Sequence, residues 1–162
     1  ADQATPGIDT ETSGIRSLHL FLKTCGIPSD EVRLDEGSGL SRAALVTPRA
    51  IVQLLRHMHT CRHAETFLNA LPVAGVDGTL AGRMKQTPAA GNVRAKTGTI
   101  RYVNCLSGYA TTADGEPLAF SLMLNNYEPP PGAPSARDDL DHIVLRLVQH
   151  TRGNPQGKGA AP

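Results

Sequence analysis

The residues best suited to chemistry lie in the run Arg94-Ala95-Lys96-Thr97-Gly98-Thr99. This run carries an ammonium group, two hydroxyls and a glycine that would let a ligand backbone approach closely. In an extended strand, Lys96 and Gly98 point to one face, unless a bulge intervenes. Thr97 and Thr99 then point to the other face. A cation, two hydroxyls and an open backbone make a suitable edge for binding a carboxylate.

The segments after this run predict the sheet that would hold it. Residues 101–112 and 117–125 place branched and apolar side chains at every second position, and residues 113–116 are typical of a turn. We therefore expect the run to form the first strand of an antiparallel trio. Ser135 and Asp138 have the spacing of a capping box, so they predict a final helix whose apolar stripe covers one sheet face.

Upstream, the sequence predicts helices and loops. Apolar residues recur at three- and four-residue spacing from Glu11 to Cys25, and Gly26 is suited to end that helix. Thr47 as N-cap, with a proline after it, predicts a second helix. The other expected elements are a short strand over 31–35, a tight loop at 37–39, a short helix over 65–71, and a glycine-rich loop over 73–92 with one helical turn near 80–84.

These elements predict an α+β fold, an antiparallel sheet with covering helices. Residues 1–10 lack any periodic pattern and are expected to be an irregular arm. Residues 11–151 are expected to be the folded part, and residues 152–162 a disordered tail.

Composition argues against a few classes of function. The chain has 162 residues, a net charge of +1 and 4% aromatic residues without tryptophan, which argues against a nucleic-acid partner. No apolar run reaches membrane-spanning length, so we expect no transmembrane segment. Its three cysteines stand at unrelated spacings and predict no disulfide framework, which leaves the compartment open.

Two other clusters contain residues that could form a site. Ser38 and Ser41 could each be a nucleophile, but a tight turn explains them better, because the surrounding residues are not those of a nucleophile elbow. The histidines and cysteine of residues 57–63 invite a metal, but their i,i+4 pairs fall on different helix faces. We therefore expect no metal and no cofactor, and a solvated helix end instead.

The order of several motifs carries a resemblance to a known family. The tripeptide Lys96-Thr97-Gly98 is one element of serine acyl-transferases that react with penicillin. Its context is the ordered set Gly37-Ser38-Gly39-Leu40-Ser41-Arg42, Val46-Thr47-Pro48, Leu71 to Leu80, Gly82-Arg83-Met84, Val93 to Thr99, Leu106-Ser107-Gly108-Tyr109, Leu118 to Ser121 and Asn125. From about Gly14 to about Gln149, the chain resembles the C-terminal part of the D-alanyl-D-alanine carboxypeptidase/endopeptidase family, the low-molecular-mass penicillin-binding proteins.

The resemblance implies roles for the site residues. It implies half of a serine β-lactamase/transpeptidase-like fold, with Lys96, Thr97 and Gly98 in the catalytic site. The Thr97 and Thr99 hydroxyls would bind the C-terminal carboxylate of a D-Ala-D-Ala peptide, and the Thr99 N–H would be an oxyanion donor. Leu40 would line the pocket. The implied partners are peptidoglycan peptides and β-lactams, and the implied location is periplasmic or extracytoplasmic.

The chain also departs from the family pattern. No serine is followed by lysine three positions on, and no Ser-x-Asn triplet occurs. Tyr102-Val103-Asn104 resembles a variant of that triplet but follows Lys-Thr-Gly instead of preceding it, and Ala44 stands where the family usually has asparagine. We therefore expect the nucleophile on an N-terminal segment or a second chain. The alternatives are an inactive peptide-binding module and a structural fragment covered by another chain.

Overall fold

The computed structural model describes residues 10–153. In chain order the elements are α1 (Thr10–Thr24), η1 (Ser29–Glu31), β1 (Val32–Arg33), β2 (Leu45–Val46), α2 (Pro48–Thr60), α3 (Ala64–Asn69), η2 (Gly78–Leu80), β3 (Arg94–Ile100), β4 (Val103–Thr111), β5 (Pro117–Asn125) and α4 (Ala136–Val148). The predicted arm and tail lie outside the described residues, except for Thr10, which begins α1, and residues 152–153.

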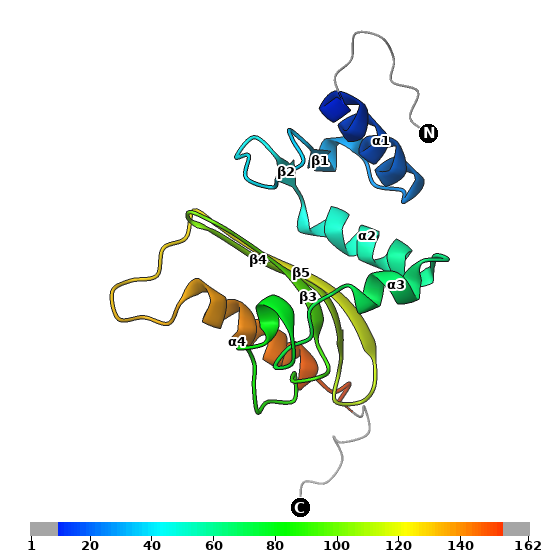
Figure 1. Cartoon of the computed structure of the whole chain (residues 1–162). Helices are drawn as coiled ribbons and strands as arrows, with labels where there is room; N and C mark the ends of the chain where they lie inside the picture. The colour runs from blue at the N-terminus through cyan, green and yellow to red at the C-terminus, as the bar shows by residue number, and fades with distance from the viewer. Residues whose placement is uncertain (1–9, 154–162) are drawn as a thin grey trace, which may run out of the picture.

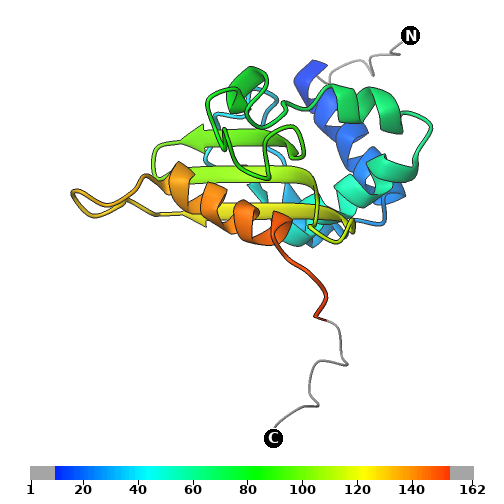
Figure 2. The same cartoon turned by 90° about the horizontal axis from the view of Figure 1, so that it is seen from below.

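The centre of the molecule is a three-stranded antiparallel sheet in the order β3-β4-β5. Its register is continuous from Arg94↔Tyr109 to Ile100↔Val103, so no bulge interrupts β3. Figures 1 and 2 show α4 across one face of the sheet and α2 across the other. This arrangement confirms the predicted α+β fold, including the strand trio and the covering C-terminal helix.

The main core lies between the sheet and α4. Leu106 of β4, with Leu140 and Val144 of α4, is at most 1% exposed. The predicted capping box begins α4, because the Ser135 side chain accepts from the Asp138 N–H and the Asp138 carboxylate accepts in return from the Ser135 backbone. The apolar stripe of α4 therefore faces the side of the sheet that carries Leu106.

A glycine allows β3 to lie close against β4. A Cβ added at Gly108 would be 2.1 Å from the Arg94 carbonyl oxygen and 2.7 Å from the Ala95 Cβ. No side chain fits there unless β3 moves outward. Gly108 therefore sets the position of the strand that carries Lys96 and Thr97.

The N-terminal region is less enclosed. A small cluster of Cys25, Ile27, Val32 and Ala50 joins the end of α1 to β1 and α2. No residue of α1 is buried, and Leu20 is 60% exposed. Figure 1 shows α1, β1 and β2 beyond α2, on the side away from α4.

Three sequence predictions were wrong in detail. The strand expected at 31–35 is only Val32–Arg33, because Ser29–Glu31 form a 3₁₀ turn, and it pairs with β2, which was not predicted. The helical turn expected at 80–84 lies at Gly78–Leu80. The second sheet strand begins at Val103 instead of residue 101, since Tyr102 takes a positive φ of 64° in the hairpin turn.

Candidate functional site

Part of β3 forms an open edge of the sheet. Upstream, this edge is covered, since Arg94 bridges to Val73 and the Ala95 N–H donates to the Pro72 carbonyl at 3.0 Å. In an antiparallel ladder, successive residues direct their backbone groups alternately to the two sides. Because Ala95 points outward, the backbone groups of Thr97 and Thr99 also point to the outer edge. A peptide could pair with the edge from Thr97 onward.

The Lys96 side chain is exposed on the face of the sheet toward α2. Its ammonium group donates to the Thr97 carbonyl at 2.8 Å. Ser107 lies opposite Lys96 on β4, and its Oγ is 2.9 Å from Ser121 Oγ on β5. A polar row therefore crosses this face, with the cation at the open edge of the sheet.

Thr97 and Thr99 lie on the other face, as the strand alternation predicts. The Thr97 hydroxyl donates to Thr79 Oγ1 at 3.0 Å, and the Thr99 hydroxyl donates to Asn104 Oδ1 at 3.4 Å. Sequence reasoning missed Thr79 and gave Asn104 no role. Strand register alone would have placed Asn104 opposite Thr99, whereas no sequence pattern pointed to Thr79, which lies in the 73–92 loop.

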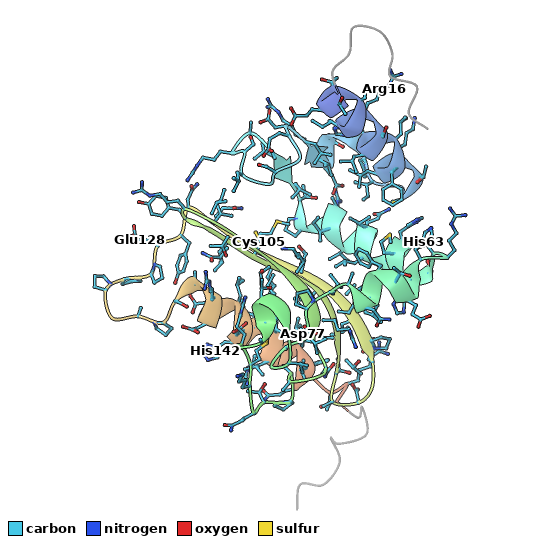
Figure 3. All side chains as sticks on the ribbon, viewed as in Figure 1. Arg16, His63, Asp77, Cys105, Glu128 and His142 are labelled. Carbon is cyan, nitrogen blue, oxygen red and sulfur yellow. The ribbon has the colours of Figure 1, made fainter. Side chains whose placement is uncertain are left out.

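Gly98 lies between Thr97 and Thr99 on β3 and pairs with Cys105 on β4. A Cβ at this position would make an ordinary contact of 3.5 Å with Cys105 Cβ, so the glycine is not required by packing within the sheet. Burial raises the pKa of the Cys105 thiol, which disfavours the thiolate form. Figure 3 shows Cys105 on the sheet and Asp77 in the loop beside it.

The loop that contains Leu40 approaches the end of β3 through Arg42. The Arg42 guanidinium donates to the Arg101 carbonyl, in the turn after β3, at 3.2 Å. The Glu36 carboxylate organises this loop by accepting from the backbone N–H groups of Ser38, Leu40 and Ser41. Leu40 itself is 73% exposed, so its place in the pocket stays a prediction.

The alternative candidates are engaged elsewhere. Ser41 Oγ donates to Asp35, and Ser38 Oγ accepts the Leu40 N–H at 3.1 Å, so both hydroxyls serve the loop. His57 packs edge-on against Phe21, and His59 lies 5.6 Å from the Tyr109 ring. Within residues 10–153, no three histidine, cysteine or acidic side chains gather in a way that could hold a metal.

An antiparallel sheet between helices, with Lys-Thr-Gly on its edge strand, fits the fold of the family that the sequence resembles. The family model described as the D-Ala-D-Ala carboxypeptidase 3 (S13) family matches residues 2–147. The chain belongs to this family.

Individual relatives agree with this assignment. The D-alanyl-D-alanine carboxypeptidase of Actinomadura sp. strain R39 is 40% identical over 98% of this chain and 29% of its own length. The D-alanyl-D-alanine carboxypeptidase DacB of Haemophilus influenzae is 36% identical over 70% of this chain and 24% of its own length. The crystal structure of penicillin binding protein 4 (dacB) from the same organism superposes with a TM-score of 0.73 at 31% identity, over 85% of this chain and 32% of that one.

The chain spans less than a third of the length of these relatives. Across the part of the chain that the structure describes, no helix is both long enough and apolar enough to cross a membrane.

Proposed function

We propose that this chain is the C-terminal segment of a serine-type D-Ala-D-Ala carboxypeptidase/endopeptidase that acts on peptidoglycan peptides outside the cytoplasm. The observation that carries this proposal is the open edge of β3. There the Lys96 cation, the Thr97 hydroxyl and the outward Thr99 N–H occur within four residues of one strand. Family membership supports the same activity.

The proposed chemistry uses a serine on a segment outside this chain. Its Oγ attacks the carbonyl carbon of the D-Ala-D-Ala peptide bond, and its proton passes to a base on that segment. The Thr99 N–H and the serine's own N–H stabilise the oxyanion. The D-Ala amine leaves with a proton, and water then hydrolyses the ester. A β-lactam would acylate the same serine.

In this proposal, the remaining site groups hold the substrate. The Thr97 and Thr99 hydroxyls donate to the carboxylate of the terminal D-Ala, and Lys96 supplies positive potential beside the nucleophile. Gly98 leaves the strand accessible to the peptide backbone. The Leu40 side chain lines the pocket at the far end of β3, where Arg42 ties its loop to the turn.

The partner segment would carry Ser-x-x-Lys and Ser-x-Asn, either ahead of this chain in one polypeptide or as a second chain. Two features support such a partner. Within the described residues, the nine-residue strand β5 pairs only with β4, so its outer edge has free backbone groups. The side chains of Leu18 and Leu20 on α1 are also more than half exposed.

Lys96→Ala in the complete protein tests the proposed site. We expect the rate of acylation by a fluorescent penicillin to fall at least about 100-fold, because the cation beside the nucleophile is lost. Lys85→Ala is the matched control, since Lys85 is exposed in the 73–92 loop, and it should label at the wild-type rate. Equal labelling of Lys96→Ala and wild type would remove Lys96 from the site.

An inactive peptidoglycan-peptide-binding or interaction module is the second candidate. It would need only the open edge of β3 with Lys96 and Thr97, which lies within this chain. Intact-mass spectrometry after penicillin treatment separates the two. The enzyme proposal expects a polypeptide that carries the nucleophile to gain the mass of the antibiotic, whereas the module proposal expects no covalent adduct.

A further inference from the structure

A hydroxyl outside the Lys-Thr-Gly strand lies beside the proposed carboxylate site. Thr79, the middle residue of η2, is exposed, and its Oγ1 accepts the Thr97 hydroxyl at 3.0 Å. We propose that Thr79 is a positioning residue that orients the Thr97 hydroxyl for the substrate carboxylate. This inference rests on the proposed function and adds a residue to its site.

The chemistry of a hydroxyl pair explains the role. Two hydroxyls in mutual contact use one proton for the hydrogen bond between them and leave the second proton free. In the observed arrangement, the free proton is that of Thr79. If a bound carboxylate accepts from Thr97 instead, Thr79 can donate to Thr97 and strengthen that bond. Either way, the pair presents one oriented O–H to the anion.

The backbone around Thr79 is held firmly in place. The Asp77 carboxylate accepts the Val73 N–H at 2.7 Å, and the Gly75 N–H donates to the Leu80 carbonyl at 3.0 Å. The Leu80 side chain is fully buried directly after Thr79. Thr79 is therefore exposed at its hydroxyl but fixed at its backbone, which suits a positioning role.

The same loop determines where a bound peptide must end. Residues 72 and 73 already occupy the outer edge of β3 as far as Ala95. A peptide that runs antiparallel along the open edge would place its C-terminus against this obstruction, next to Thr97 and Thr79. The C-terminus of the bound peptide meets the hydroxyl pair there. The pair should therefore contribute more to kcat/KM for a peptide with a free carboxylate than for one with an uncharged C-terminus.

The loop is further anchored to the covering helix. The Arg83 guanidinium bonds both oxygens of Asp141 on α4, from its Nε at 3.1 Å and from its Nη2 at 2.6 Å. Both side chains are mostly buried, at 15% and 14% exposed. The bond between Thr79 and Thr97 therefore joins β3 to a loop that is separately anchored to α4.

The test compares Thr79→Val, which removes the hydroxyl, with Thr79→Ser, which keeps it, in the complete protein. Thr66→Val is the matched control, because Thr66 is exposed on α3. The substrates are one peptide ending in D-Ala-D-Ala with a free carboxylate and the same peptide with a C-terminal amide. The values of kcat and KM are measured for each pair, and the melting temperature of each variant is measured alongside.

We expect Thr79→Val to lower kcat/KM about tenfold on the carboxylate peptide, the loss of one hydrogen bond that acts on a charged group. The loss should shrink to less than about twofold on the amide. Thr79→Ser and Thr66→Val should match wild type on both peptides, and all melting temperatures should agree.

Three results would overturn the role. These are an unchanged kcat/KM for Thr79→Val, an equal loss on both peptides, and a Thr79→Ser variant as poor as Thr79→Val. Penicillin labelling of the wild-type protein is measured first. Its absence would overturn the proposed function and this inference together, whereas a labelled wild type with a fully active Thr79→Val variant overturns only the inference.

Discussion

The sheet with α4 and the N-terminal region with α1 enclose their apolar residues very differently. In the sheet unit (residues 73–148), side chains from the loop, all three strands and α4 meet in one core. In the N-terminal unit (residues 10–46), α1 buries no residue, and Leu18, Leu20, Leu40 and Leu45 are all more than half exposed. The sheet unit contains most of what stabilises it. The N-terminal unit has the surface of an element that packs against something else.

The comparison predicts a large difference between two leucine truncations. Leu140→Ala, at a site 1% exposed, should cost about 2–5 kcal/mol of the free energy of unfolding, because it leaves a cavity under the sheet. Leu20→Ala, at a site 60% exposed, should change it by less than about 0.5 kcal/mol. Urea unfolding of the chain, followed by circular dichroism because tryptophan is absent, measures both. Similar losses would show that the two units are equally enclosed.

Removing the arginine of a buried ion pair should likewise cost more unfolding free energy than removing the arginine of an exposed one. Arg83→Ala should cost about 2–3 kcal/mol, because it leaves the mostly buried Asp141 carboxylate without its partner. Arg152→Ala is the control. Its pair with Glu116 involves an arginine that is 74% exposed, so we expect a loss below about 1 kcal/mol. The same unfolding measurement applies, and a small loss for Arg83→Ala would mean that the 73–92 loop is anchored by packing alone.

The sequence predicted the sheet unit well because its signals are local and periodic. Alternation along β4 and β5, the spacing of Ser135 and Asp138, and the Lys-Thr-Gly motif each lie within one short segment. The family resemblance, which the comparisons confirmed, rested on segments of the sheet unit together with residues 37–42 and 46–48. The three site residues Lys96, Thr97 and Gly98 were correctly expected on a strand, while their catalytic roles stay predictions.

The features that sequence reasoning missed depend on partners far apart in the chain. Thr79 bonds a residue 18 positions later, and Arg83 pairs with one 58 positions later. Neither interaction leaves a periodic pattern, because each arises only when the loop folds back on the sheet and α4. A two-residue strand such as β2 is likewise too short to show alternation.

The smallest expected effect concerns the loop of the N-terminal unit and its dependence on pH. Hydrogen bonds from Ser38 and from the Ser41 and Leu40 N–H groups lower the pKa of Glu36 to about 2. A carboxyl whose pKa is lower in the folded loop stabilises that loop above its ordinary pKa of about 4.3. The stabilisation is lost as the pH falls from there through about 2.

Amide NMR shifts of Leu40 and Ser41 should therefore titrate near pH 2, well below the range of an ordinary glutamate. The variant Glu36→Gln should remove this titration, because it has no ionisable group at that position. A midpoint at the ordinary glutamate value would show that the loop is as loosely held as the rest of the N-terminal surface.

Gly108 gives the fold a consequence for how the family's sequences can vary. The residue is buried beneath Arg94 and Ala95, on a strand that carries none of the Lys-Thr-Gly motif. Even the single methyl of alanine at this position would overlap the β3 backbone and push the edge strand outward. In a library of variants selected for activity, position 108 should therefore tolerate less change than an exposed position such as Lys85, because the placement of the edge strand depends on Gly108.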